Sequence, residues 1–126
     1  GVLFTRDPLS GEDVRVIEAS FGLGEAVVQG LVTPDRYVLS SDGRLLANDV
    51  GEKDRMIRWT EDGGLAEVSV PDALVEAPCL DEECLRQLDS LARRCEAVFG
   101  GAQDLEFAFR GGRLHLLQRR AITRVG

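Results

Sequence analysis

The feature that most constrains the fold is a stretch near the end of the sequence in which hydrophobic and polar residues alternate on both sides of a double glycine. Residues 103–110 and 113–120 flank Gly111-Gly112, and this alternation predicts two β-strands joined by a tight hairpin. Successive strand side chains point to opposite faces, so Asp104 and Glu106 share one face and the hydrophobic residues between them share the other. The stretch therefore predicts a hairpin with one hydrophobic and one acidic face.

The two acids of this hairpin need a positive neighbour. Asp104 and Glu106 lie about 7 Å apart on one strand, so their carboxylates repel each other unless a cation or a basic side chain lies between them. Burying Glu106 charged and unpaired costs several kcal/mol, so it must be exposed, paired with arginine or bound to a metal. A structural salt bridge stays open as an alternative to a ligand site, because the same segment carries Arg110, Arg113, Arg119 and Arg120.

The length of the hairpin loop decides which side chains share a face. If Gly111-Gly112 alone forms the loop, Glu106 lies opposite Leu117 and Gln118 falls on the hydrophobic side. A three-residue loop, Arg110–Gly112, places Glu106 and Gln118 on one face, because a slip of one residue inverts every side chain of a strand. Hydrophobic matching favours the shorter loop, whereas a shared ligand favours the longer loop or a bulge. We predict the longer loop.

The rest of the chain predicts an α+β fold. From Asp81 to Phe99 the hydrophobic residues recur every three or four positions, which indicates an amphipathic helix capped by Asp81 and ended by Gly100-Gly101. The other strand-like segments are separated by turns and not by helix-length connections, which favours antiparallel pairing. We expect a mainly antiparallel sheet with one long helix, its remaining strands being 2–5, 15–20, 36–40, 44–50, 54–60 and 65–70.

Composition limits the class of protein. The 126 residues make one domain, and a formal charge of −7, from 22 acids and 15 bases, argues against a nucleic-acid or membrane partner. No signal peptide and no run of roughly 18 apolar residues is visible, so we expect a cytoplasmic protein. Cys79, Cys84 and Cys95 form no CxxC pair and are expected to be free thiols. The sequence opens in a strand-like run without methionine, which indicates a fragment of a larger chain.

Two smaller features are interpreted conservatively. The glycine-rich turn Phe21–Glu25 precedes residues 26–30, which could form one or two helical turns, and such a turn can bind phosphate through backbone N–H groups. It lacks the third glycine of a dinucleotide fingerprint and the Gly-Lys-Ser/Thr of a P-loop, so a plain turn is preferred. Lys53, a lone base among acids, is expected to be a solvated turn residue and not a phosphate contact.

Four blocks of the sequence resemble a known family. Gln103–Glu106 and Leu116–Thr123 are similar to the end of the ATP-binding domain of the phosphoenolpyruvate synthase and pyruvate phosphate dikinase family, which rifampicin phosphotransferases share. Gly1–Pro8 and Ile17–Gly30 continue the resemblance in the family's order. It implies that residues 1–126 are the C-terminal part of an ATP-grasp nucleotide-binding domain. Missing partners would be the N-terminal lobe of that domain and the domain that carries the phosphohistidine.

The resemblance also implies a binding site. In the family, an acid-x-acid pair and a glutamine on the next strand hold Mg²⁺ and the phosphates of ATP, and these carry over to Asp104, Glu106 and Gln118. Arg120 carries over as a phosphate partner whose planar donor fork suits that task. Glu106 and Gln118 are the expected magnesium ligands, and no catalytic residue is assigned. His115 does not match the family's phosphate-carrying histidine and is expected to be an ordinary strand residue.

The resemblance implies a phosphotransferase parent. In the intact enzymes, ATP yields AMP and phosphate while the β-phosphoryl group passes through the histidine to pyruvate or to an antibiotic hydroxyl. The fragment alone is expected to be inactive. The chain departs from the family at Arg119 and Ala121, where a small residue and a proline are common, but neither is a proposed ligand. The alternative is a stand-alone interaction or regulatory module, which a start codon beside Gly1 would favour over an upstream extension.

Overall fold

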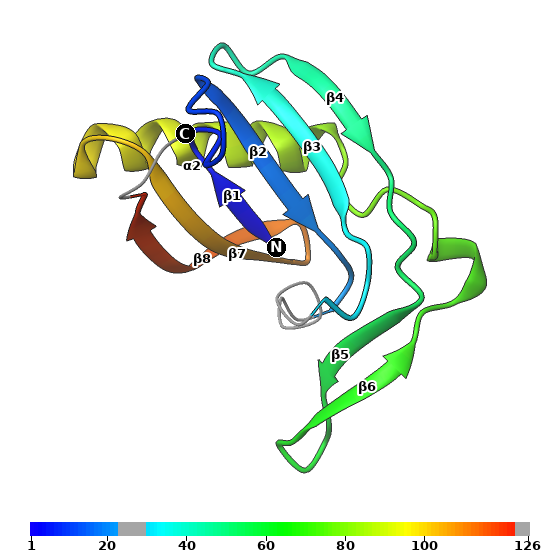
Figure 1. Ribbon diagram of the computed structural model, residues 1–126. Helices are drawn as coiled ribbons and strands as arrows, with labels where there is room; N and C mark the ends of the chain where they lie inside the picture. Colours follow the sequence, from blue (N-terminus) through cyan, green and yellow to red (C-terminus); the bar gives the residue numbers. More distant parts are fainter. Residues whose placement is uncertain (23–29, 123–126) are drawn as a thin grey trace.

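The computed structural model describes residues 1–22 and 30–122, and it has a helix packed on one face of a sheet (Figure 1). This sheet has six strands in the order β4-β3-β2-β1-β7-β8, and every neighbouring pair is antiparallel. Two further strands, β5 and β6, form a separate antiparallel ribbon. The strands are β1 (Val2–Phe4), β2 (Val14–Ala19), β3 (Asp35–Ser40), β4 (Leu45–Asp49), β5 (Arg55–Trp59), β6 (Leu65–Ser69), β7 (Gln103–Arg110) and β8 (Arg113–Ala121).

The first strand joins the two ends of the chain. β1 pairs with β2 through Leu3 opposite Ile17, and on its other edge it pairs with β7 through Leu3 opposite Leu105. The three side chains are fully buried. Antiparallel pairing of strands joined by turns, as in β1 and β2, was predicted from the sequence, whereas the pairing of β1 with β7 was not. This pairing joins the predicted acidic hairpin to the N-terminal strands in one sheet, with β8 at its edge.

The helix α2 (Glu82–Phe99) begins and ends where the sequence predicts. The carboxylate of Asp81 accepts a hydrogen bond from the backbone N–H of Cys84 at 2.8 Å, and Gly100 ends the helix with a positive φ of 67°. The buried face of α2 packs on the sheet side that carries Leu3, Ile17, Tyr37, Leu39, Leu105 and Phe107, and the two layers together form the main hydrophobic core. Its own buried residues are Leu85, Leu88, Leu91, Ala92 and Cys95.

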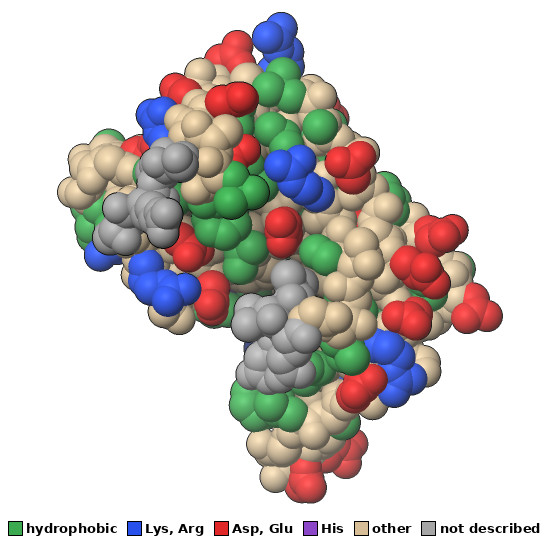
Figure 2. All heavy atoms as spheres, viewed as in Figure 1, with side chains coloured by type: hydrophobic (Ala, Val, Ile, Leu, Met, Phe, Trp, Pro, Cys, Tyr) green, Lys and Arg blue, Asp and Glu red, His purple; other side chains and the backbone are tan. Residues whose placement is uncertain are grey.

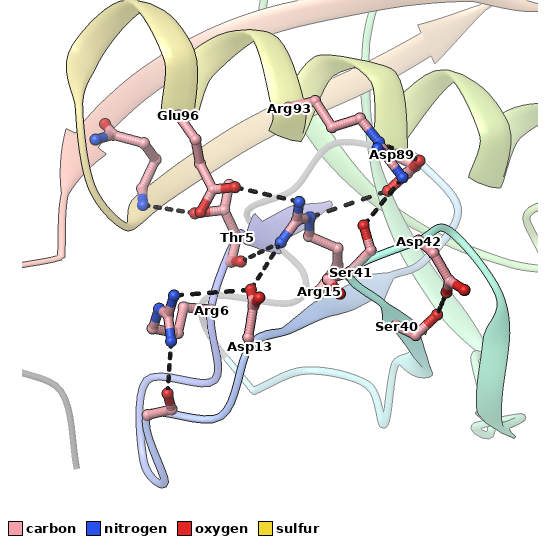
Figure 3. A network of polar contacts seen from close by, with 12 residues as sticks. Thr5, Arg6, Asp13, Arg15, Ser40, Ser41, Asp42, Asp89, Arg93 and Glu96 are labelled. Atoms are coloured by element: carbon pink, nitrogen blue, oxygen red, sulfur yellow. Dashed lines mark hydrogen bonds and ion pairs between the residues drawn. The ribbon is translucent and has the colours of Figure 1, made fainter.

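A buried arginine fastens α2 to the sheet (Figure 3). Arg15 of β2 is 3% exposed, and its guanidinium donates to the carbonyl oxygen of Thr5 at 2.9 Å. It also forms an ion pair with Glu96 of α2, at 3.1 Å, and lies 4.0 Å from Asp89. Because these acids lie seven residues apart, about two turns along one helix face, the arginine sets how α2 lies across the strands.

A second buried ion pair anchors the connection to the ribbon and corrects the expectation for Lys53. Its side chain is 0% exposed and its Nζ donates to Asp35 Oδ1 at 2.6 Å and to the carbonyl oxygen of Gly51 at 2.9 Å. Asp35 also accepts from the backbone N–H groups of Gly51 and Cys79, both at 2.8 Å, and from the Tyr37 hydroxyl at 3.3 Å. Lys53 is therefore a structural residue and not a solvated one.

The ribbon itself has little core of its own. Ile57 of β5 is buried with Val32, and the exposed side chains of Trp59 and Leu65 face each other across the strands. Figure 1 shows the ribbon extending away from the six-stranded sheet. The mainly antiparallel sheet and the long helix confirm the predicted α+β class and are consistent with a partial ATP-grasp-like domain. No helix among residues 1–22 and 30–122 combines the length and apolar character needed to cross a bilayer.

Candidate functional site

The predicted site residues lie on the face of the sheet that α2 does not cover, which we call the open face. Strand pairing aligns them in two rows that run across the strands. Figure 2 views the molecule from this side and shows hydrophobic side chains exposed beside acidic and basic ones. The first row contains Gln118, Glu106, Val2, Glu18 and Arg36, and the second contains Arg120, Asp104, Phe4, Val16 and Val38.

A bulge in β8 places Glu106 and Gln118 opposite each other. The loop is the two-residue Gly111-Gly112, with Arg110 paired to Arg113, so the prediction of a three-residue loop is wrong. Both glycines have positive φ, 57° and 76°, as a tight hairpin turn requires. Phe107 pairs with Leu116 and Glu106 pairs with Gln118, which leaves Leu117 as the extra residue. The bulge thus keeps Leu116 opposite Phe107 and still places Gln118 on the same face as Glu106.

Asp104 and Arg120 face each other one pair further along the hairpin. Their ion pair is long, 3.5 Å between Arg120 Nη2 and Asp104 Oδ2, and the arginine side chain is 66% exposed. A long, exposed pair of this kind is weak. Arg120 therefore keeps most of its donor capacity, and Asp104 can orient it toward an anion on the open face.

Glu106 is half-buried and Gln118 is exposed. Within residues 1–22 and 30–122, no side-chain hydrogen bond or ion pair is formed by either side chain. The structural salt bridge that the sequence left open for Glu106 is thus not formed in the described part of the chain. Its carboxylate and the amide oxygen of Gln118 are left for water or a ligand.

The open face carries an acid that sequence reasoning missed. Glu18 of β2 is separated from Glu106 only by Val2, at roughly two strand spacings or 10 Å. On the far side, Glu18 lies opposite Arg36 of β3. The alternation of residues 15–20 already placed Glu18 away from the core, but only the insertion of β1 between β2 and β7 brings it near the other acids.

The donor set fits a magnesium ion that also binds phosphate. Mg²⁺ prefers hard oxygen ligands and normally takes one or two protein groups beside water and phosphate oxygens. Glu106 and Gln118 offer a carboxylate and an amide oxygen from facing strands, with Asp104 on the same face. No cluster of three or more His, Cys, Asp or Glu suited to a metal occurs among the described residues. The chain thus offers a partial shell that phosphate oxygens would complete, and not a metal cage.

Two cavities in the described part of the chain lie away from the predicted ligands. A cavity of about 360 Å³ lies between α2 and β8 and is lined by Gln87, Ser90, Leu91, Arg94, Arg113, Leu114 and Leu116. Another, of about 170 Å³, lies at the end of the strands beside Ala19, Ser20, Cys79 and Phe107. The predicted ligands line neither of these two cavities, so enclosing a nucleotide over them requires a second surface.

His115, the three cysteines and the glycine-rich turn were the other features singled out in the sequence. His115 lies opposite Ala108 in β8 and is exposed. The three cysteines are free thiols, as expected, and burial, with the Asp35 carboxylate nearby, raises the pKa of Cys79 to about 12. That thiol stays protonated at neutral pH. Most of the glycine-rich turn and the helical turns expected after it, residues 23–29, lie outside the described residues.

Comparison with known proteins covers the whole chain. Residues 1–126 match the family model described as pyruvate phosphate dikinase, AMP/ATP-binding domain. This domain is the N-terminal part of such proteins, so a C-terminal placement of the chain in the whole protein is corrected. That residues 1–126 are the C-terminal part of the ATP-binding domain itself stays a prediction. The predicted resemblance to phosphoenolpyruvate synthases and rifampicin phosphotransferases is confirmed.

Named relatives are much longer than this chain. It is 43% identical to a probable phosphoenolpyruvate synthase of Methanothermobacter thermautotrophicus, over 100% of this chain and 18% of the relative. It is 40% identical to another of Archaeoglobus fulgidus, over 99% of this chain and 17% of the relative. A rifampicin phosphotransferase of a Streptomyces species is 36% identical over 98% of this chain and 14% of the relative. Because the family model matches residues 1–126, the chain belongs to the family of the pyruvate phosphate dikinase AMP/ATP-binding domain.

Proposed function

We propose that the open face forms one wall of a Mg-ATP site in an ATP-dependent phosphotransferase. The observation that carries the proposal is the register of the hairpin, because the bulge at Leu117 turns Gln118 to the same face as Glu106, Asp104 and Arg120. Membership in an AMP/ATP-binding family makes a nucleotide the natural ligand for these oxygen donors and this arginine. The remaining wall belongs to parts of the ATP-grasp domain outside the 126 residues.

Each side chain has a separate task in this proposal. Glu106 and Gln118 hold the magnesium ion through a carboxylate and an amide oxygen, and Asp104 lies beside them on the same face. Arg120 donates to a phosphate oxygen, and Asp104 keeps its guanidinium directed along the open face. Magnesium, when bound, would offset the negative charge of the phosphate oxygens. Phosphoryl transfer depends mainly on such positioning and charge neutralisation.

The phosphoryl acceptor is determined outside this domain. Relatives with similar identity to the chain are named as probable phosphoenolpyruvate synthases and as rifampicin phosphotransferases. We propose a phosphoenolpyruvate synthase-like parent that converts ATP to AMP and phosphate and passes a phosphoryl group through a histidine of another domain to pyruvate. A rifampicin phosphotransferase-like parent is the second candidate. In either case we propose a cytoplasmic protein, where ATP is available and its three free cysteines stay reduced.

The site is tested by titrating the full-length parent with ATP and excess magnesium in a calorimeter. We expect Glu106→Ala to raise Kd about 10- to 100-fold, or about 1.4–2.8 kcal/mol, because it removes a charged metal ligand. The matched control is Glu61→Ala, which removes an exposed acid from the turn of the ribbon and should bind like the wild type. With magnesium chelated, wild type and Glu106→Ala should bind ATP with similar, weak affinity. Unchanged affinity of Glu106→Ala in the presence of magnesium would refute the site.

A further inference from the structure

We infer that Arg119, which the proposed ligand set does not include, is a positioning residue that keeps β8 in the register the site requires. The inference rests on the proposed Mg-ATP site, because the consequence of the register is the placement of Gln118 and Arg120. In the part of the chain that the structure describes, β8 is an edge strand that pairs only with β7, and its pairing shifts between Phe107 and Glu106. A strand of this kind can also pair in a second register, without the bulge.

The alternative register would dismantle the site. If the pairing of Phe107 with Leu116 continued regularly, Leu117 would lie opposite Glu106 and Arg119 opposite Asp104. Gln118 would then point to the side covered by α2, because a slip of one residue inverts the side chains of the strand. This register would also give Arg119 an acidic partner. Contacts elsewhere must therefore favour the bulged register.

Arg119 makes two such contacts on the helix side of the sheet. Its guanidinium carbon lies 3.8 Å from the ring centroid of Phe99, the last residue of α2. Its Nη1 donates to Gln103 Oε1 at 2.7 Å. Gln103 is 1% exposed and is itself held, through its backbone N–H to Thr5 Oγ1 at 2.8 Å and its side-chain Nε2 to the carbonyl oxygen of Gly101 at 3.2 Å.

Both contacts of Arg119 are made to residues outside β8. Phe99 and Gln103 flank the turn between α2 and β7, so an arginine that stacks on one and donates to the other can reach both only from the helix side of β8. The residues before and after Arg119 must then point to the opposite face. The structure assigns the placement of Gln118 and Arg120 to the side chain between them.

The first test compares affinities for Mg-ATP in the full-length parent. Arg119→Ala should raise Kd about tenfold, which corresponds to about 1.4 kcal/mol and is within the range of a cation–π contact plus a charged hydrogen bond. Arg119→Lys keeps a donor for Gln103 but loses the planar group over Phe99, so its Kd should lie between those of the wild type and Arg119→Ala. If Arg119→Ala does not fold, Arg119→Lys should still fold. Arg113→Ala, an exposed arginine of the same strand, is the control and should bind like the wild type.

A deletion separates positioning from simple stabilisation. Removing Leu117 makes Glu106 opposite Gln118 the regular register, so Arg119→Ala in this background should change Kd by less than about twofold. An equal loss of affinity in both backgrounds would overturn the inference, because it would show a role that does not act through the register. Wild-type affinity of Arg119→Ala, when Glu106→Ala binds weakly, would overturn it as well.

Hydrogen exchange without nucleotide makes the inference independent of the proposed function. In the full-length parent, Arg119→Ala should speed the exchange of backbone amides in residues 118–121 and leave those in 113–116 unchanged. If Glu106→Ala binds Mg-ATP normally, the proposed function fails, and this exchange pattern still decides whether Arg119 holds the register. Unchanged exchange in residues 118–121 would refute the positioning role.

Discussion

Two acids of the same sheet, Asp35 and Glu106, have opposite surroundings. Asp35 is 0% exposed and accepts hydrogen bonds from Lys53, Tyr37 and two backbone N–H groups. Glu106 lies half-buried on the open face and, within the described residues, forms no side-chain hydrogen bond or ion pair. An acid whose oxygens are all occupied stabilises the fold and has no capacity for a ligand. An acid held in place by its strand but left without a partner is available to one.

The largest expected effect comes from removing the carboxylate of Asp35, the buried acid of the two. Asp35→Ala leaves the Lys53 ammonium buried without its carboxylate, and we expect the free energy of unfolding to fall by about 3–5 kcal/mol. Chemical denaturation of the parent, followed by a signal from this domain, measures the change. Asp54→Ala removes an exposed acid next to Lys53 and is the matched control. Equal midpoints for the two variants would show that the ion pair does not stabilise the fold.

Lowering the pH should also reduce the free energy of unfolding through Asp35. Burial raises its pKa, but the hydrogen bonds from Lys53 and from the N–H groups of Cys79 and Gly51 outweigh this and lower the pKa below its ordinary value. A carboxyl whose pKa is lower in the folded state stabilises the fold above its unfolded pKa, about 3.9, and this contribution is lost as the pH falls through the folded pKa.

Unfolding free energies measured between about pH 2 and pH 7 test this direction. The wild type should lose stability below about pH 4 more steeply than Asp35→Asn, which has no carboxyl to protonate at this position. Above about pH 5 the two slopes should be equal, because Asp35 is ionised in both folded and unfolded chains there. Parallel slopes down to pH 2 would contradict the assignment.

The smallest expected effect concerns Glu106, the acid on the open face. Glu106→Gln should change the free energy of unfolding by no more than about 0.5 kcal/mol, because no protein partner of the carboxylate is lost within the described residues. The same denaturation experiment measures it, with Glu61→Gln as the exposed control. A loss above about 2 kcal/mol would mean that Glu106 is a structural acid like Asp35, and the comparison would fail.

Sequence patterns predicted the strands and the helix better than they predicted which residues contact one another in the tertiary structure. The period of two in residues 103–110 and 113–120 and the positions of Asp81 and Gly100 were enough for the strands and the helix, because alternation and capping are local properties. Lys53 was misjudged because its partner, Asp35, is 18 residues away and no local pattern links the two. Glu18 was missed for a similar reason.

The sequence by itself determined which side chains of β7 share a face, since a strand exposes alternate residues whatever it pairs with. It did not determine which residues of β8 face them. That was decided by tertiary structure, because the loop, the hydrophobic face and the contacts of Arg119 with Phe99 and Gln103 can be satisfied together only with a bulge at Leu117. Pairing of β1 between β2 and β7 likewise depends on a core closed by residues about 100 positions apart, and no local pattern contains that information.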